Sequence, residues 1–234
     1  MVDEAAATLG TIDILVNNAG VFFPHPIEAS TYEEWQRGWR DTIDINLIGA
    51  ANAAWCAFQH MPRGRDSRII NVGSRGAFRG EPDSPAYGAS KAALSAFGQS
   101  IAKSLGHLGI AVTTLAPGFV DTDMAAASLA GAGGDEIRAQ SPFNRVPTAQ
   151  EVAKAVVFLA SPTAEWASGG ILDFNGASYL RIMLAARPSA GWLGSDNLRV
   201  CAASSNSPAS PSPCRRSHQL SRPSSSWLSG CGRS

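Results

Sequence analysis

A tyrosine and a lysine lie four residues apart in this sequence, as Tyr87 and Lys91, and Ser74 lies thirteen residues before the tyrosine. On a helix, residues four apart share a face, so a phenol and an ammonium at this spacing lie side by side. An adjacent cation favours the phenolate, so we expect the pKa of Tyr87 to fall below its ordinary value of about 10. Because general acid–base catalysis needs a pKa near the operating pH, the pair predicts proton exchange with a substrate oxygen.

Alternating strands and helices are predicted to position these residues. The strands are expected at 12–16, 68–72, 110–115 and 170–174. The helices are expected at 31–61, 85–107 and 148–159, while 121–148 is rich in Ala, Gly and Pro and is expected to be mobile. This alternation indicates right-handed βαβ units in a parallel sheet with helices on both faces. The fold class predicted is therefore α/β, a partial Rossmann-type doubly wound sheet of about four strands.

Three polar or glycine-containing segments follow the predicted strands. They are Asn17-Asn18-Ala19-Gly20, Ser74, and Pro117-Gly118. Ligands of parallel α/β sheets bind at the carboxyl ends of the strands. We therefore expect these segments to lie at one edge of the sheet, next to Tyr87 and Lys91.

Composition excludes several other classes of function. The formal net charge is zero, so nothing suggests a nucleic-acid or anionic-membrane partner. No apolar run approaches the roughly 18 residues of a membrane span, and the N-terminus does not have the pattern of a secretory signal. The four cysteines, Cys56, Cys201, Cys214 and Cys231, suit neither a disulfide framework nor a metal site, so we expect a reducing, cytoplasmic location and no metal.

Taken together, the motifs resemble those of the short-chain dehydrogenase/reductase family, in the branch that includes 3-oxoacyl-(acyl carrier protein) reductases. The similarity covers residues 5–178. The matching motifs are Asn17-Asn18-Ala19-Gly20, Asn46 within 44–49, Ile69–Ser74, Tyr87-Gly-Ala-Ser-Lys91, Ala116–Thr122, the run 145–152, and Ser168-Gly169-Gly170. Each motif alone is weak, but their order and spacing together are specific.

The resemblance implies a role for each catalytic position. Tyr87 would be the acid–base residue, and Ser74 would donate a hydrogen bond to the substrate oxygen. Lys91 would lower the pKa of Tyr87 and bind the nicotinamide ribose. Asn46 would hold a water that connects Lys91 to solvent.

The resemblance also implies NAD or NADP as the cofactor, which carries the hydride chemistry. The implied cofactor-binding residues are Asn17, Ala19, Gly20, Tyr87, Lys91, Pro117, Gly118, Val120 and Thr122. Substrate choice is expected to depend on 121–148 and on Phe22, Phe23 and Phe78, which suggest a partly apolar pocket. His25, His60 and His107 have no partner pattern and are interpreted as structural or surface residues.

Members of this family normally open with a strand, a glycine-rich turn and a helix, which hold the cofactor pyrophosphate. This sequence does not contain that pattern, and the strand at 12–16 corresponds to the family's fourth. We therefore expect a truncated domain at 1–180 with an unprotected edge strand and severely weakened or lost dinucleotide binding. Residues 181–234 are rich in Ser, Pro and Arg and are expected to form a disordered tail.

Two functional hypotheses remain open. In the first, the chain is an oxidoreductase that interconverts a ketone and a secondary alcohol, with a small-molecule substrate and a homo-oligomeric state. In the second, it is a catalytically incompetent fragment that associates with a full-length relative or has no function of its own. A relative of the sugar-nucleotide epimerases is disfavoured by the short length and by the Asn-Asn-Ala-Gly run.

Overall fold

The sheet is parallel throughout, as the sequence predicts, in a computed structural model that describes residues 1–64 and 66–181. Its strands are β1 (Ile14–Asn17), β2 (Ser67–Val72), β3 (Ile110–Pro117) and β4 (Ile171–Phe174), and they lie in the order β1-β2-β3-β4. The register pairs Val16 with Ile70, Thr113 with Ile70, and Leu115 with Leu172. The predicted tail, apart from Arg181, lies outside the described residues.

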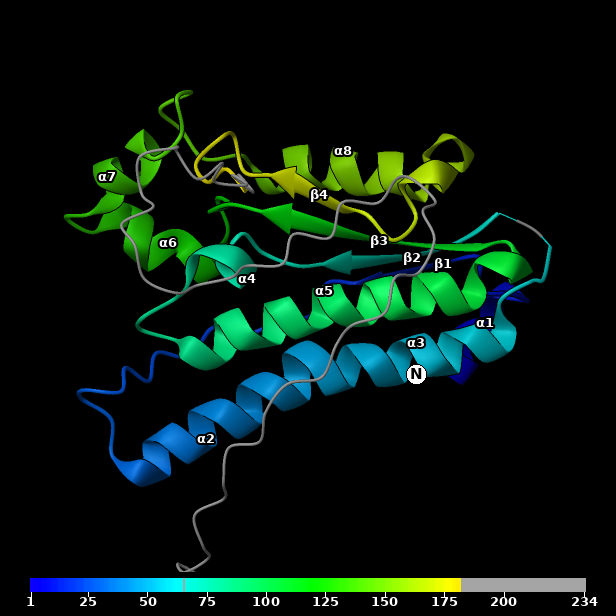
Figure 1. The fold of residues 1–234 in the computed structure, drawn as a ribbon, viewed down its shortest axis with the longest axis horizontal. Coiled ribbons are helices and arrows are strands. Elements are labelled where there is room, and N and C mark those ends of the chain that lie inside the picture. Colours follow the sequence, from blue (N-terminus) through cyan, green and yellow to red (C-terminus); the bar gives the residue numbers. More distant parts are fainter. Residues whose placement is uncertain (65, 182–234) are drawn as a thin grey trace, which may run out of the picture. The chain divides into compact units, whose positions relative to one another are not determined.

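Helices cover both faces of the sheet (Figure 1). One face carries α1 (Val2–Leu9), α3 (Ala50–His60) and α5 (Pro85–Leu105), while α8 (Ala149–Ala160) covers the other. The helix α2 (Tyr32–Ile43) precedes α3, and the short helices α4 (Gly76–Arg79), α6 (Asp123–Ala130) and α7 (Gly134–Ala139) gather at the end toward which the strands point. No helix in this part of the chain is both long and apolar enough to cross a membrane.

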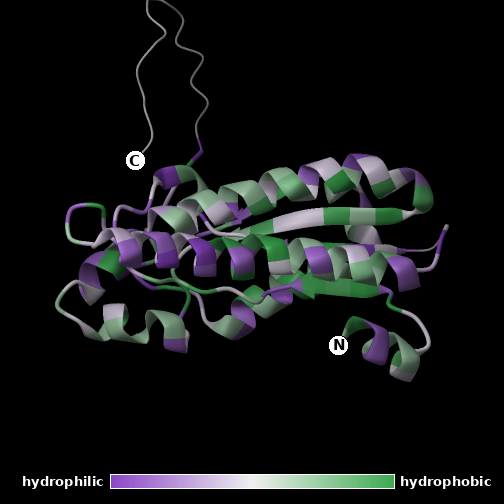
Figure 2. Ribbon diagram, turned by 90° about the horizontal axis from the view of Figure 1, so that it is seen from below, coloured by the Kyte–Doolittle hydropathy of each residue, from purple (hydrophilic) through white to green (hydrophobic). Residues whose placement is uncertain are grey.

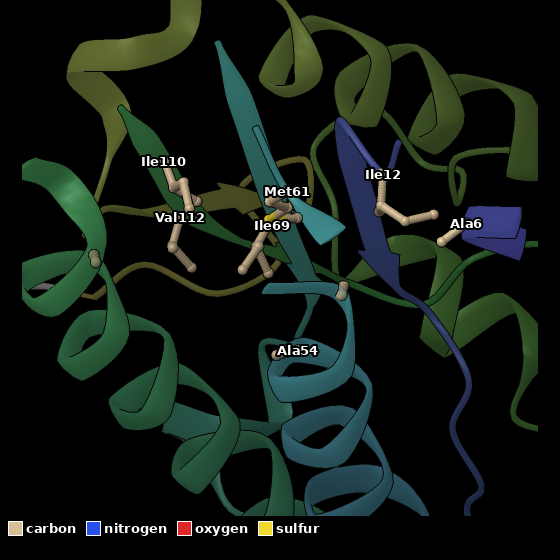
Figure 3. Packing of buried hydrophobic residues seen from close by; sticks show 9 residues of the cluster. Ala6, Ile12, Ala54, Met61, Ile69, Ile110 and Val112 are labelled. Carbon is tan, nitrogen blue, oxygen red and sulfur yellow. The ribbon is translucent and has the colours of Figure 1, made fainter. Parts of the chain in front are cut away.

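The apolar residues of the central strands form two cores, one on each face. The first packs Ile69, Ile110 and Val112 against Ala54 and Met61 of the helical layer, as Figure 3 shows. The second packs Ile70 and Leu115 against Leu159 of α8. Because adjacent strand residues point to opposite faces, a strand buried on both faces carries apolar residues on both sides, and Figure 2 shows hydrophobic colour along much of the strands.

The starts of the main helices follow local sequence signals. A capping box begins α8, in which Thr148 and Glu151 satisfy each other's backbone N–H groups, and an equivalent box of Thr31 and Glu34 begins α2. Pro85 occupies the first turn of α5, where its missing N–H costs nothing. These signals fix where the helices begin and therefore where Tyr87 is placed.

Three features of the fold differ from the expectations. The predicted helix at 31–61 is interrupted by a π-helical segment, Asp44–Gly49. The stretch 121–148, expected to be mobile, contains α6 and α7. The helix α1 was not predicted. The two short helices α6 and α7 and the eight-residue α1 are too short to have a strong periodic signature, since short helices depend on tertiary packing.

Within the described residues, β1 is an edge strand, as expected. Its Leu15 faces the layer of α1, α3 and α5. On the opposite face, Ile14 and Val16 are 48% and 39% exposed, because α8 covers the central strands and does not reach β1. The apolar surface of this strand is therefore only half covered.

Candidate functional site

The predicted catalytic residues meet at the carboxyl ends of β2 and β3. Ser74 follows β2 by two residues. The residue before it, Gly73, donates its N–H to the Leu115 carbonyl of β3. Tyr87 and Lys91 lie on the first two turns of α5, which crosses beneath these strand ends (Figure 1). A helix and two strands far apart in sequence thus place three candidate groups in one region.

Ser74 and Tyr87 are directly associated. The Ser74 hydroxyl oxygen accepts a hydrogen bond from the Gly76 N–H at 3.0 Å, which leaves the Ser74 proton available to another acceptor. Burial raises the pKa of the Tyr87 phenol above its ordinary value, while a hydrogen bond with Ser74 lowers it and the Glu81 carboxylate raises it further. The expectation that the pKa of Tyr87 falls below its ordinary value is wrong here, because the loss of solvation is the largest effect.

Lys91 has an unusual environment for an ammonium. Its side chain is 4% exposed, and its Nζ donates a hydrogen bond to the Val72 carbonyl oxygen at 2.9 Å. The Nζ atom lies 5.8 Å from the centre of the Tyr87 ring. Burial lowers the pKa of Lys91 to about 8. The group therefore remains mostly charged at neutral pH, with protons left for further acceptors.

The Asn46 side chain binds the backbone of the loop that follows β1. Its Oδ1 accepts from the Val21 N–H at 2.8 Å, and its Nδ2 donates to the Val21 carbonyl at 3.0 Å and to the Ser90 hydroxyl at 3.1 Å. The side chain is fully buried at the wide π-helical turn, a feature often found at functional sites. Both amide protons are used in these bonds, so the predicted water relay through Asn46 would depend on its remaining oxygen lone pair and stays a prediction.

The predicted cofactor-binding residues of the first loop have different environments. Asn17 is buried, and its Nδ2 donates to the Asn71 Oδ1 at 2.9 Å, so its side chain ties β1 to β2. Ala19 is exposed. A Cβ on Gly20 would lie 3.2 Å from the Lys91 Nζ and 3.3 Å from the Asn46 Oδ1. A side chain at position 20 would therefore crowd these two groups.

The second predicted cofactor segment follows β3. Pro117 is buried and Gly118 donates its N–H to the Phe174 carbonyl at 3.2 Å. Val120 is half-buried, and Thr122 is exposed at the start of α6. The segment therefore runs outward from the strand ends toward the short helices. This position agrees with a role at the nicotinamide end, which stays a prediction.

The aromatic residues expected to shape the substrate pocket separate into two groups. The Phe22 ring contacts the Tyr87 ring edge-on, with centroids 5.0 Å apart. Phe23 is 41% exposed on the same loop. Phe78 instead packs under the guanidinium of Arg181, 4.4 Å from its ring centre. Phe22 is thus the member of the set with a direct contact to a candidate catalytic residue.

Two buried residues were missed as parts of this site. His25, interpreted as structural or surface, accepts the Ala86 N–H on its Nε2 at 3.3 Å, while its Nδ1 lies 2.7 Å from the Phe23 carbonyl. It thereby holds the loop after β1 to the residue before Tyr87. Arg75, the residue after Ser74, is buried without an ion-pair partner among the described residues. The only sequence signal for either was proximity to a motif residue.

Comparisons with known proteins agree with this arrangement. A family model described as enoyl-(acyl carrier protein) reductase matches residues 1–176. The 3-oxoacyl-(acyl carrier protein) reductase FabG of Escherichia coli K12 is 37% identical over 180 residues, which are 77% of this chain and 72% of that protein. The cis-4-hydroxycyclohexanecarboxylate dehydrogenase of Sinomonas cyclohexanicum is 35% identical over 176 residues, covering 75% of this chain and 69% of that protein.

Solved structures agree as well. A short-chain dehydrogenase of Burkholderia cenocepacia J2315 in complex with NADP has a TM-score of 0.68 and 33% identity, covering 76% of this chain and 69% of that one. A short-chain dehydrogenase/reductase of Brucella melitensis, described as a glucose/ribitol dehydrogenase, has a TM-score of 0.69 and 30% identity, covering 76% and 70%. Sequence and backbone therefore point to the same group of proteins.

Proposed function

Because the chain belongs to the short-chain dehydrogenase/reductase family of NAD(P)-dependent oxidoreductases, we propose that it interconverts a ketone and a secondary alcohol, with Tyr87 as the acid–base residue. The observation that supports this most directly is the meeting of Ser74, Tyr87 and Lys91 at the carboxyl ends of the strands. The relatives' names, which include a ketone reductase and a dehydrogenase of a secondary alcohol, support the same reaction class.

The residues present fit the nicotinamide end of NAD or NADP. The Lys91 ammonium donates one hydrogen bond, to the Val72 carbonyl, and has two further protons that suit the hydroxyl oxygens of a ribose. Gly20 lies against it without a side chain, and a Cβ there would crowd the ammonium. When bound, the nicotinamide supplies or accepts the hydride.

The proposed proton chemistry uses Tyr87 and Ser74. In the reducing direction, the carbonyl carbon gains the hydride and its oxygen gains the phenolic proton of Tyr87. The raised pKa of Tyr87 keeps this proton in place at neutral pH. The Ser74 hydroxyl, whose oxygen is held by the Gly76 N–H, donates a hydrogen bond to the same substrate oxygen and stabilises its developing charge.

Lys91 would act after Tyr87 has given up its proton. Loss of the proton leaves a phenolate, and an ammonium 5.8 Å from the ring centre stabilises it in a poorly solvated site. The phenolate is reprotonated before the next turnover. In the oxidising direction the same phenolate takes the proton of the alcohol, so oxidation should increase with pH while reduction continues at neutral pH.

The test is the consumption of NADH and NADPH by the purified chain with a panel of ketones. We expect Tyr87→Phe to lower kcat/KM by about 10²- to 10⁴-fold, the usual contribution of a positioned acid or base. Tyr32→Phe is the matched control, because Tyr32 is 69% exposed on α2, and it should keep the wild-type rate. Equal inactivity of the folded wild type and Tyr87→Phe would rule out intrinsic activity.

The half-covered apolar edge of β1 favours a second candidate function. Ile14 and Val16 are exposed on a strand whose outer backbone groups are unpaired within the described residues. In this alternative the chain acts by associating with a full-length relative and does not bind dinucleotide alone. Calorimetric titration of the isolated chain with NADPH and NADH separates the two: micromolar binding by the monomer supports the oxidoreductase and rejects the alternative.

A further inference from the structure

Arg75 is held at the candidate site by its backbone. It directly follows Ser74, and its N–H donates to the Pro117 carbonyl at 2.8 Å, which fixes it between the carboxyl ends of β2 and β3. Its side chain is 3% exposed. A long, flexible cation that is buried immediately after a candidate catalytic residue requires an explanation, because burying a charge is costly unless it is paired.

The polar partners of this guanidinium in the described residues are both neutral. One NH₂ group donates to the Ser178 hydroxyl and the other to the Gln140 side-chain carbonyl. The ring of Phe119 lies 5.3 Å away. The nearby carboxylate of Glu81 is hydrogen-bonded to Arg79, at 3.2 Å. Burial, followed by the repulsion of Arg79, lowers the pKa of Arg75 to about 10, against a smaller opposing effect of Glu81. Among the described residues Arg75 makes no ion pair, so its charge is only partly compensated.

The segments that meet Arg75 surround the strand ends. Gln140 ends α7, and Ser178 follows β4. A Cβ on Gly118 would lie 3.2 Å from the Ser178 hydroxyl, so this hydroxyl packs against the segment expected at the nicotinamide. Ala177, next to Ser178, has a φ of +59°, a conformation that costs free energy for a residue with a side chain. Such strain is concentrated at ligand clamps and active sites.

We propose that Arg75 binds a carboxylate of the substrate, so that the ketone is an oxo acid and the alcohol a hydroxy acid. The proposal rests on the function proposed above, since it names the substrate class of the same site. The planar guanidinium presents paired N–H donors that match the two oxygens of a carboxylate. Before substrate binds, the neutral oxygens of Ser178 and Gln140 accept the guanidinium N–H groups and hold the guanidinium in place. They are weaker acceptors than a carboxylate, so the substrate anion replaces them.

The experiment uses pairs of substrates that differ only in the negative charge. Oxo acids with one to four carbons between the ketone and the carboxylate are each compared with their methyl esters. We expect the wild type to favour the best-fitting acid over its ester by about ten- to a hundredfold in kcat/KM, the range for hydrogen bonds to charged groups. Arg75→Met should bring this ratio close to one, and Arg75→Lys should give an intermediate ratio.

Arg79→Met is the matched control, because it removes the same charge one turn away on α4 and should keep the wild-type ratio. Circular dichroism establishes that each variant is folded. A second readout without turnover is calorimetric titration with the same acids, in which saturable binding by wild type and Arg79→Met should be lost in Arg75→Met.

The outcomes distinguish the two proposals. Selective acid binding through Arg75 without turnover would support the carboxylate site and reject the oxidoreductase. Equal turnover of acids and esters by the wild type would reject the carboxylate site and keep the oxidoreductase. If acids and esters are equal but Arg75→Met changes the preference between NADPH and NADH, the guanidinium serves a cofactor phosphate and the proposal is overturned. Absence of both binding and turnover would reject both.

Discussion

Replacing Lys91 with methionine should make this protein more stable at neutral pH, although we propose that Lys91 belongs to the catalytic machinery. The ammonium is 4% exposed, and its partner is the neutral Val72 carbonyl. Methionine has a similar length and an apolar, adaptable side chain, so it can occupy the same space. The variant therefore removes a buried charge without opening a cavity.

The magnitude follows from the pKa of Lys91. Its folded-state value of about 8, against an ordinary value of 10.5, corresponds to about 3 kcal/mol of unfavourable free energy in the charged folded state. Loss of the hydrogen bond to the Val72 carbonyl costs about 1 kcal/mol. The free energy of unfolding at pH 7 should therefore rise by about 2 kcal/mol in Lys91→Met.

The effect should depend on pH with a definite sign. Between pH 8 and 10.5 the unfolded chain still holds the proton that folded Lys91 has released, so the free energy of unfolding of the wild type rises with pH in this window. The methionine variant lacks this titration. Its advantage should therefore shrink from pH 8 upward, and above pH 10.5 it should be less stable than wild type by about 1 kcal/mol.

The assay is urea denaturation of both proteins from pH 7 to pH 10.5, with the difference in free energy plotted against pH. Lys154→Met, at an exposed lysine on α8, is the matched control and should change stability by no more than about 0.5 kcal/mol at any pH. A Lys91→Met variant that is less stable at pH 7, or a difference that does not change with pH, would refute the reasoning from burial.

Four further substitutions test other parts of the fold. Gly38→Ala would place a Cβ 2.7 Å from the His25 ring, so we expect a loss of about 1–3 kcal/mol in thermal or urea unfolding. Asn46→Ala leaves backbone groups of the loop after β1 without partners, and it should cost about 1–3 kcal/mol and raise the hydrogen-exchange rate of that loop. Thr148→Ala removes the cap of α8 and should cost about 1 kcal/mol in the same unfolding assay. The pKa of Glu151 is lowered to about 2 by Arg145 and the Thr148 backbone, so the stability from this carboxylate is present at neutral pH and should be lost as pH falls from about 4.5 through 2, most clearly against Glu151→Gln.

The strands and the long helices could be predicted because their signals are local. A buried parallel strand is mostly apolar, and capping residues such as Thr148 mark helix starts through bonds within four residues. The parallel direction of the strands followed from the alternation of strands and helices. The interruption at 44–49 was not predictable in this way, since it depends on Asn46 bonding across to the loop after β1 and to α5.

In the candidate site, too, local patterns were predictable and effects of tertiary contacts were not. The types and spacing of Ser74, Tyr87 and Lys91 were enough to place them together, because strand ends and helix faces are fixed by regular geometry. The direction of the Tyr87 pKa was not predictable, since it is set by how much water the surrounding elements remove. His25 was missed for a related reason: its acceptor role depends on a tertiary contact with the start of α5.

The buried charges near the strand ends determine which ligands the site favours. Among the described residues, the buried ionisable side chains include Arg75 and Lys91 near the strand ends, and none is an aspartate or glutamate. The Glu81 carboxylate is 15% exposed and is hydrogen-bonded to Arg79, so neither Arg75 nor Lys91 has an ion-pair partner among the described residues. These two poorly solvated cations raise the free energy of the folded state. An anion at this place, whether the Tyr87 phenolate or a ligand carboxylate, lowers that free energy more than it would in water. Occupation by an oxo acid should therefore stabilise the protein, and the Arg75→Met and Lys91→Met variants should each lose part of that stabilisation.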